Sequence, residues 1–160
     1  MTGSTGTAST FRVGLVQMRA GRVPAANLDA AAKLIGEAKR GGADYVLTPE
    51  MTNIMEIGRD KVLAAISAEE NDPSLAVFRE LARSFGIYLH IGSLAVKVSP
   101  EKAANRSLLI DPHGDLARDM EAFCADLPPR HHRRRRLRAR RAGAAIRPVR
   151  LGIQPDHHAL

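Results

Sequence analysis

The 160-residue sequence has little of several things: one cysteine, Cys124, no tryptophan, and an aromatic content of only 4%. A single cysteine excludes the internal disulfide framework of small secreted domains. No apolar run approaches the roughly 20 residues that a membrane-spanning helix needs. The segment Met1 to Thr10 lacks the apolar core of a secretory signal. These absences predict a cytoplasmic protein that does not enter the membrane.

The charge is divided unevenly along the chain. The formal net charge is +7, but residues 130–160 contain ten arginines, no lysine and one acid, Asp156, which gives +9. The difference between +7 and +9 leaves −2 for residues 1–129. A mildly acidic body and a strongly basic tail therefore need separate explanations.

The body alternates short apolar runs with amphipathic segments. Residues 11–18 and 44–48 are nearly continuous in apolar side chains, as in strands that are covered on both faces. The full set of expected elements is strands at 11–18, 44–48, 87–98 and 103–111, and helices at 27–40, 59–67 and 72–85. This order predicts an α/β fold with a mixed sheet.

The helix at 72–85 has the clearest boundaries. Asp72 can cap its N-terminus by accepting a backbone N–H, and Pro73 suits the first helical position because an N–H there would have no helical partner. Gly86 can take the left-handed conformation that commonly ends a helix. After the last expected strand, the sequence DPHGD at 111–115 predicts a turn.

Glu50 is the candidate catalytic residue. It follows the apolar strand at 44–48 directly after Pro49, so we expect it at the C-terminal end of that strand, where open α/β sheets place their ligand sites. A partly desolvated carboxylate there can act as a general base near neutral pH. The alternative is a solvated loop glutamate. The chemical interpretation predicts that the Glu50 carboxylate faces a cleft rather than open solvent.

Three stretches resemble the nitrilase superfamily of carbon–nitrogen hydrolases: FRVGLVQM at 11–18, ADYVLTPEMTN at 43–53, and the run from DPSLAVFRELARSFGIYLHIGSLAVK to AANRSLLIDPHGDLAR at 72–118. The resemblance is to hydrolases of small amides, of the nitrilase and omega-amidase type. It implies an αββα sandwich, of which residues 11–118 supply the N-terminal part. It also implies a small amide or nitrile as substrate, no metal or organic cofactor, and a tendency to form homo-oligomers.

The family chemistry uses a glutamate, a lysine and a cysteine that forms a thioester with the substrate. Glu50 matches the family's glutamate. The lysine is expected shortly after residue 118, but the sequence has no lysine beyond Lys102, and Lys97 and Lys102 are interpreted as surface charges. Cys124 falls where the family has an aspartate, before the position of the nucleophile. The resemblance therefore assigns Glu50 alone, and the 160-residue chain is expected to be inactive.

Residues 119–160 lose the motif resemblance, and two interpretations of them stay open. The arginines of 133–141 could contact nucleic-acid phosphates, which would make the chain a non-enzymatic nucleic-acid-binding module with little sequence preference, because 130–160 contains no aromatic residue. Arginine without lysine is also typical of out-of-frame translation of a GC-rich gene, which we favour. Both interpretations predict three parts: a disordered N-terminus at 1–10, the hydrolase part at 11–118, and a disordered basic tail at 119–160 with no packed element in 130–160.

Overall fold

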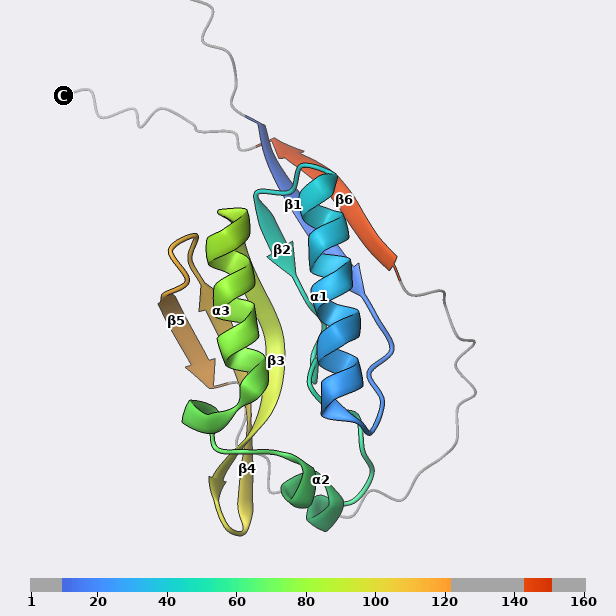
Figure 1. Ribbon diagram of the computed structural model, residues 1–160, viewed down its shortest axis with the longest axis vertical. Coiled ribbons are helices and arrows are strands. Elements are labelled where there is room, and N and C mark those ends of the chain that lie inside the picture. The colour runs from blue at the N-terminus through green and yellow to red at the C-terminus, as the bar shows by residue number, and fades with distance from the viewer. Residues whose placement is uncertain (1–9, 122–142, 151–160) are drawn as a thin grey trace, which may run out of the picture.

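A mixed six-stranded sheet with helices on one face organises residues 10–121 and 143–150, which the computed structural model describes (Figure 1). The strand order is β5-β4-β3-β2-β1-β6. The strands are β1 (Thr10–Gln17), β2 (Tyr45–Leu47), β3 (Tyr88–Ser99), β4 (Lys102–Ile110), β5 (Leu116–Glu121) and β6 (Gly143–Arg150). The helices are α1 (Pro24–Arg40), α2 (Arg59–Ala65) and α3 (Pro73–Phe85), with a short 3-10 helix η1 (Glu69–Asn71).

The seven expected elements are all present in the expected order, which confirms the α/β class and the mixed sheet. β1, β2 and β3 are parallel, whereas β4 and β5 continue the sheet in antiparallel pairs. The described residues thus form one helical layer on one sheet of the expected sandwich. The largest difference in boundaries is at α1, which begins at Pro24 rather than at residue 27 because proline fits its first turn.

The expectation of a disordered tail at 119–160 is wrong for residues 119–121, which belong to β5, and the expectation of no packed element in 130–160 is wrong for β6. This strand pairs antiparallel with β1 along its whole length, from Thr10 opposite Arg150 to Gln17 opposite Gly143. The physical reason is that pairing satisfies the backbone N–H and C=O groups of β1, which depends on the backbone and not on apolar side chains. Pro148 is tolerated because β6 lies at the edge of the sheet. Cys124 and the arginines of 133–141 lie outside the described residues.

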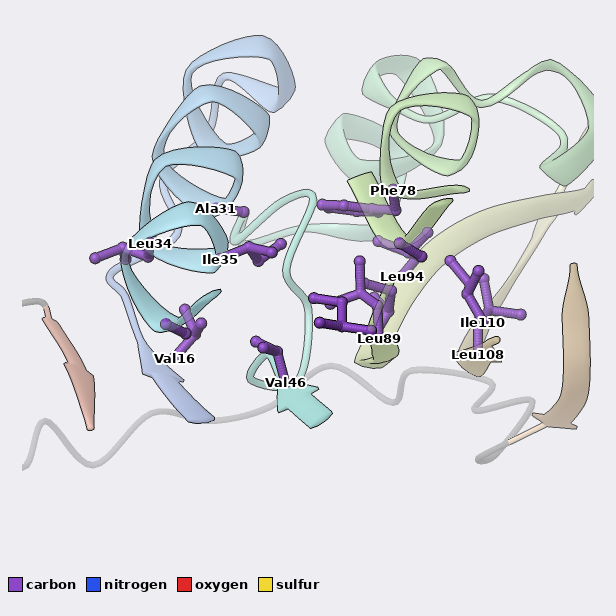
Figure 2. Packing of buried hydrophobic residues seen from close by; sticks show 14 of the residues in the cluster. Val16, Ala31, Leu34, Ile35, Val46, Phe78, Leu89, Leu94, Leu108 and Ile110 are labelled. Atoms are coloured by element: carbon purple, nitrogen blue, oxygen red, sulfur yellow. The ribbon is translucent and has the colours of Figure 1, made fainter. Parts of the chain in front are cut away.

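The main core lies between the sheet and the two long helices (Figure 2). Its larger members include Val46 from β2, Leu89 from β3, Ile35 from α1 and Phe78 from α3, each of them fully buried. Burying such a side chain contributes about 1.5–3 kcal/mol, so this cluster stabilises the stacking of helices on sheet. None of the described helices is long and apolar enough to cross a membrane.

The ends of α3 follow the local signals in its sequence. The Asp72 side chain accepts a hydrogen bond from the Ser74 backbone N–H at 2.7 Å, so the expected N-cap is confirmed. Gly86 has φ 59° and ψ 46°, the left-handed conformation that was expected at the C-terminus. Both ends of the helix are therefore fixed by the residues that directly flank it in the sequence.

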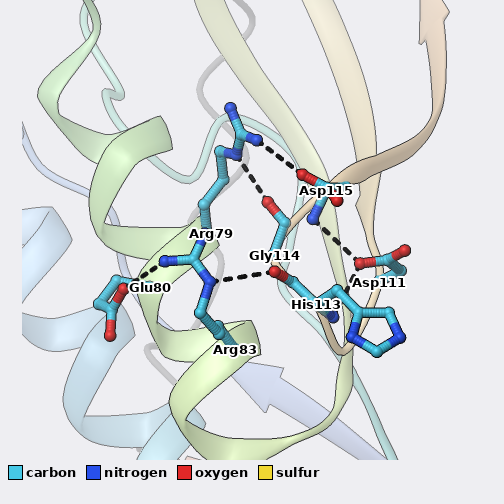
Figure 3. A network of polar contacts seen from close by, with 7 residues as sticks. All are labelled: Arg79, Glu80, Arg83, Asp111, His113, Gly114 and Asp115. Carbon is cyan, nitrogen blue, oxygen red and sulfur yellow. Dashed lines mark hydrogen bonds and ion pairs between the residues drawn. The ribbon is translucent and has the colours of Figure 1, made fainter.

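The turn between β4 and β5 is tied to the surface of α3 (Figure 3). Arg79 donates from Nε to the Gly114 carbonyl at 2.6 Å, and Arg83 donates from Nε to the His113 carbonyl at 3.0 Å. Within the turn, the Asp111 carboxylate accepts the His113 backbone N–H at 2.8 Å. These bonds attach the β4–β5 hairpin to the helical layer.

The face of the sheet opposite the helices carries a hydrogen-bonded row of side chains. His90 Nδ1 contacts the Tyr45 hydroxyl, and His90 Nε2 lies 2.8 Å from Ser107 Oγ. Ser107 donates its own hydrogen to the Ile91 carbonyl at 3.2 Å. Ser107 therefore accepts from His90 Nε2–H, and His90 Nδ1 accepts from Tyr45, so the row fits a neutral imidazole. Burial lowers the pKa of His90 from its ordinary value of 6.5 and raises that of Tyr45.

We predict that His90 makes the fold acid-sensitive. The folded-state pKa of His90 lies below 6.5, so as the pH falls the imidazole binds a proton more readily in the unfolded chain than in the folded one. The stability that the neutral His90 contributes is therefore present above about pH 6.5 and is lost as the pH falls below it. The melting temperature of the His90→Gln variant should therefore fall less than that of the unaltered chain between about pH 7.5 and about pH 5. His113→Gln, at an exposed histidine, is the control. Equal acid sensitivity in both variants would contradict the assignment.

Candidate active site

Glu50 lies just beyond the C-terminal end of β2, a strand flanked by β1 and β3 in the middle of the sheet. This position was expected from the sequence. The expectation that the Glu50 carboxylate faces a cleft rather than open solvent is wrong within the described residues, because the Glu50 side chain is exposed. The helices α1 and α3 pack on the face of the sheet and leave the Glu50 side chain exposed.

One side chain holds the Glu50 carboxylate. Asn105 on β4 donates from Nδ2 to Glu50 Oε1 at 2.9 Å. The bond spans β3, which lies between β2 and β4 in the sheet. The other carboxylate oxygen, Oε2, has no hydrogen-bond partner among the described residues, so it is free to accept a proton.

The loop that carries Glu50 is fastened to β3 through Ser93, a residue only 1% exposed. Ser93 Oγ accepts the Met51 backbone N–H at 2.8 Å, and its carbonyl accepts the Thr52 N–H at 2.9 Å. Thr52 Oγ1 donates back to the Pro49 carbonyl at 2.6 Å. These bonds bracket Glu50 on both sides, so its backbone is fixed relative to β3.

Met51 has φ 55°, a left-handed conformation that residues other than glycine rarely adopt. Such a conformation costs about 1–3 kcal/mol and persists only where surrounding contacts hold it. The Ser93 hydroxyl supplies that contact at the Met51 N–H. Backbone strain thus coincides with the residue next to the candidate base, as it commonly does at functional sites.

Gly92 allows the loop to approach β3 closely. A Cβ placed at Gly92 would lie 2.3 Å from the Thr48 carbonyl oxygen and 2.7 Å from the Pro49 carbonyl group. Both neighbours are backbone, so neither can move aside without moving Glu50. The register of β3 with β4 also shifts between Ile91 and Leu94, as at a β-bulge.

Two buried asparagines, Asn27 and Asn53, hold the loop that follows Glu50. Asn53 accepts the Ala95 backbone N–H and donates to the Ala95 carbonyl, each at 2.9 Å. Asn27 on α1 donates to the Asn53 carbonyl at 2.9 Å and exchanges two bonds with the Gly21 backbone. The Glu50 loop is thereby linked to α1, to β3 and to the segment after β1. A small apolar cluster packs nearby, formed by Ile54, Val62, Ile66 and Ala95.

The remaining candidates from the sequence lie apart from Glu50 or outside the described residues. Lys97 and Lys102 flank the tip of the β3–β4 hairpin, and Lys102 is exposed. Within the described residues, Glu50 makes no ion pair and no three His, Cys, Asp or Glu side chains gather as a metal site would require. Sequence reasoning missed Gly92, Ser93 and Asn105. A glycine inside a strand is the one signal that could have indicated the close approach.

We predict that Gly92→Ala destabilises the chain by about 1–3 kcal/mol, because the added methyl group overlaps backbone that cannot relax independently. Urea-induced unfolding measures the loss. Gly21→Ala is the matched control, since its Cβ would meet only Asn27 Oδ1, at an ordinary 3.7 Å. A Gly92→Ala variant as stable as Gly21→Ala would show that the loop is not held against β3.

Comparisons with known proteins show what the whole chain is similar to. The chain is 29% identical over 121 residues to a hydrolase of Schizosaccharomyces pombe, a match that covers 74% of this chain and 37% of that protein. An amidase structure from Nesterenkonia sp. superposes with a TM-score of 0.65 at 29% identity, and the match covers 79% of this chain and 48% of the amidase. The C. elegans NitFhit structure shares the fold, with a TM-score of 0.64 at 23% identity, covering 71% of this chain and 28% of NitFhit.

The chain therefore spans less than half the length of each of these relatives. The family model described as carbon–nitrogen hydrolase matches residues 12–148, a range that extends past residue 118 and takes in most of β6. Since this match covers most of the sequence, the chain belongs to the carbon–nitrogen hydrolase family.

Proposed function

We propose that this chain supplies the general-base part of an active site that hydrolyses small amides, with Glu50 as the base. The observation that carries the proposal is the immobilised turn at the C-terminal end of β2, which presents an exposed carboxylate with one oxygen bound by Asn105 and the other free. A base needs a fixed position and an accessible lone pair, and this arrangement provides both.

Small aliphatic amides are the substrate class that the comparisons favour. Structures of the Nesterenkonia amidase include an alanine mutant in complex with butyramide and a glutamate-to-glutamine mutant that shows acrylamide added at the active-site cysteine. These matched structures are 28–29% identical to this chain. Their ligands are short, uncharged primary amides. We extend that substrate class to this chain.

In the proposed reaction the carboxylate takes the proton of a cysteine thiol, and the thiolate attacks the amide carbon. Collapse of the tetrahedral intermediate breaks the C–N bond, and the amine leaves as ammonia with the transferred proton. The same carboxylate then deprotonates a water molecule that attacks the thioester, which releases the acid and restores the thiol. Glu50 would act as base in both half-reactions, while a lysine would stabilise the oxyanion.

The 160 residues do not contain the other two groups where the family resemblance places them. The last lysine is Lys102, and Cys124 is the only thiol. Losing one donor to an oxyanion typically costs about 10²–10³ in rate, and losing a nucleophile costs more. We therefore propose that the 160-residue chain alone does not hydrolyse amides and that Glu50 acts only when the other two groups are supplied.

We predict no ammonia release from butyramide above background by the purified chain, with Glu50→Gln and Cys124→Ala indistinguishable from it. A hybrid in which residues 12–118 replace the matching part of the Nesterenkonia amidase should hydrolyse butyramide. In that hybrid, Glu50→Gln should lower kcat by at least about 10²-fold, the usual contribution of a general base, whereas Glu70→Gln should not.

Turnover by the unmodified chain that both Glu50→Gln and Cys124→Ala abolish would contradict the proposal that the chain alone lacks a complete active site. An active hybrid unaffected by Glu50→Gln would contradict the base role.

The alternative function is non-specific nucleic-acid binding by the +9 segment at 130–160. The arginines of 133–141 on which it rests lie outside the described residues, so it stays a hypothesis. Binding to random duplex DNA that weakens steeply with salt would support it.

Out-of-frame translation of 119–160 stays a hypothesis that reading the gene in three frames would test. Cytoplasmic location and homo-oligomerisation likewise stay predictions.

A further inference from the structure

We propose that Asn105 is a positioning residue for the Glu50 carboxylate and that it occupies its place in β4 for this purpose at a cost to stability. The inference rests on the proposed role of Glu50 as the base. It adds a second residue to the site, contributed by a strand that is not adjacent to β2.

The geometry singles out Asn105 as the side chain that fixes the carboxylate. Its Nδ2 donates to Glu50 Oε1 at 2.9 Å from a position 55 residues away in the sequence. Glu50 is exposed, and no other side chain of the described residues forms a hydrogen bond or ion pair with its carboxylate. An exposed glutamate without such a partner samples several rotamers, so the Asn105 bond selects one of them.

The other end of the Asn105 amide is evidence that the residue is not there for stability. Its Oδ1 is buried and has no hydrogen-bond partner among the described residues. Turning the amide over would place Oδ1 against the Glu50 carboxylate, oxygen against oxygen, and would lose the only side-chain bond that Glu50 has. The contact with Glu50 therefore dictates an orientation that leaves a buried acceptor unpaired.

The strand context supports the same conclusion. Asparagine is depleted in β-strands, where β-branched side chains are favoured. Asn105 nevertheless lies inside β4, paired with Ala95 of β3. A residue that breaks both the propensity rule and the rule on buried polar groups is expected at functional sites rather than at purely structural ones.

Two substitutions separate positioning from packing. Asn105→Asp keeps the shape of the side chain but replaces the donor by a carboxylate, and Asn105→Val removes the polar group and suits a strand. In ¹³C,¹⁵N-labelled full chain, the three-bond couplings to Cγ of Glu50 report whether its χ1 angle holds one rotamer or averages. Ser107→Ala is the control, because Ser107 lies two residues along β4 and bonds His90 and Ile91 instead of Glu50.

We expect single-rotamer couplings at Glu50 in the unaltered chain and in Ser107→Ala, and averaged couplings in Asn105→Asp and Asn105→Val. The melting temperature of Asn105→Val should be unchanged or raised, by up to about 5 °C. Averaged couplings in the unaltered chain, single-rotamer couplings in both Asn105 variants, or a melting temperature lowered by Asn105→Val would each overturn the proposal.

This measurement does not depend on turnover, so it separates the two proposals. If the couplings behave as expected while Glu50→Gln leaves the hybrid amidase active, the base role fails and the positioning contact stands. If Glu50→Gln abolishes hybrid activity while Glu50 keeps one rotamer without Asn105, the base role stands and the positioning role fails.

Discussion

The site depends on one constraint: the loop after β2, which carries Glu50, is hydrogen-bonded to Ser93 and packed against Gly92 in the middle of β3. Ser93 bonds the backbone on the C-terminal side of Glu50, and Gly92 leaves room for the Thr48 and Pro49 carbonyl groups on the N-terminal side. A side chain at position 92 would move the loop, and without the Ser93 hydroxyl the left-handed Met51 would lose its compensating contact. The placement of Glu50 is therefore a property of the parallel β2–β3 pair.

The rest of the described fold supports that pair. The core between the sheet and α1 and α3 fixes β2 and β3 from one side, and the Asn27–Asn53 hydrogen bond joins the loop to α1. On β4, Asn105 then sets the direction of the carboxylate. One part of the proposed catalytic site is thus assembled within a chain that spans less than half the length of the relatives it matches.

Local signals explain what could be predicted from the sequence. Asp72 and Gly86 mark the ends of α3 because capping depends on residues adjacent in the chain. The placement of Glu50 after β2 followed from an apolar run that ends in proline, which is also a local pattern. The interactions that were missed are long-range. The Asn105–Glu50 bond spans 55 residues, and β6 joins β1 through its backbone, which side-chain composition does not report.

The exposure of Glu50 was missed for a different reason. A strand end in a parallel sheet predicts where a carboxylate sits, but its burial depends on which segments lie over it, and those are set by tertiary structure. Within the described residues the helices cover one face of the sheet and leave this end open. Position was therefore predictable from sequence, whereas the environment of the carboxylate was not.

Native-state hydrogen exchange at the Met51, Thr52 and Ala95 amides tests the central claim that this loop is preassembled in the chain. Each amide donates to a partner on the other side of the loop–strand junction: Ser93 Oγ, the Ser93 carbonyl and Asn53 Oδ1. If the loop is held as described, the three amides should exchange as slowly as the strand amides of β3, because opening them would require the junction to separate. Exchange at the rate of an exposed loop, with β3 still protected, would show that the contacts between this loop and β3 do not position Glu50.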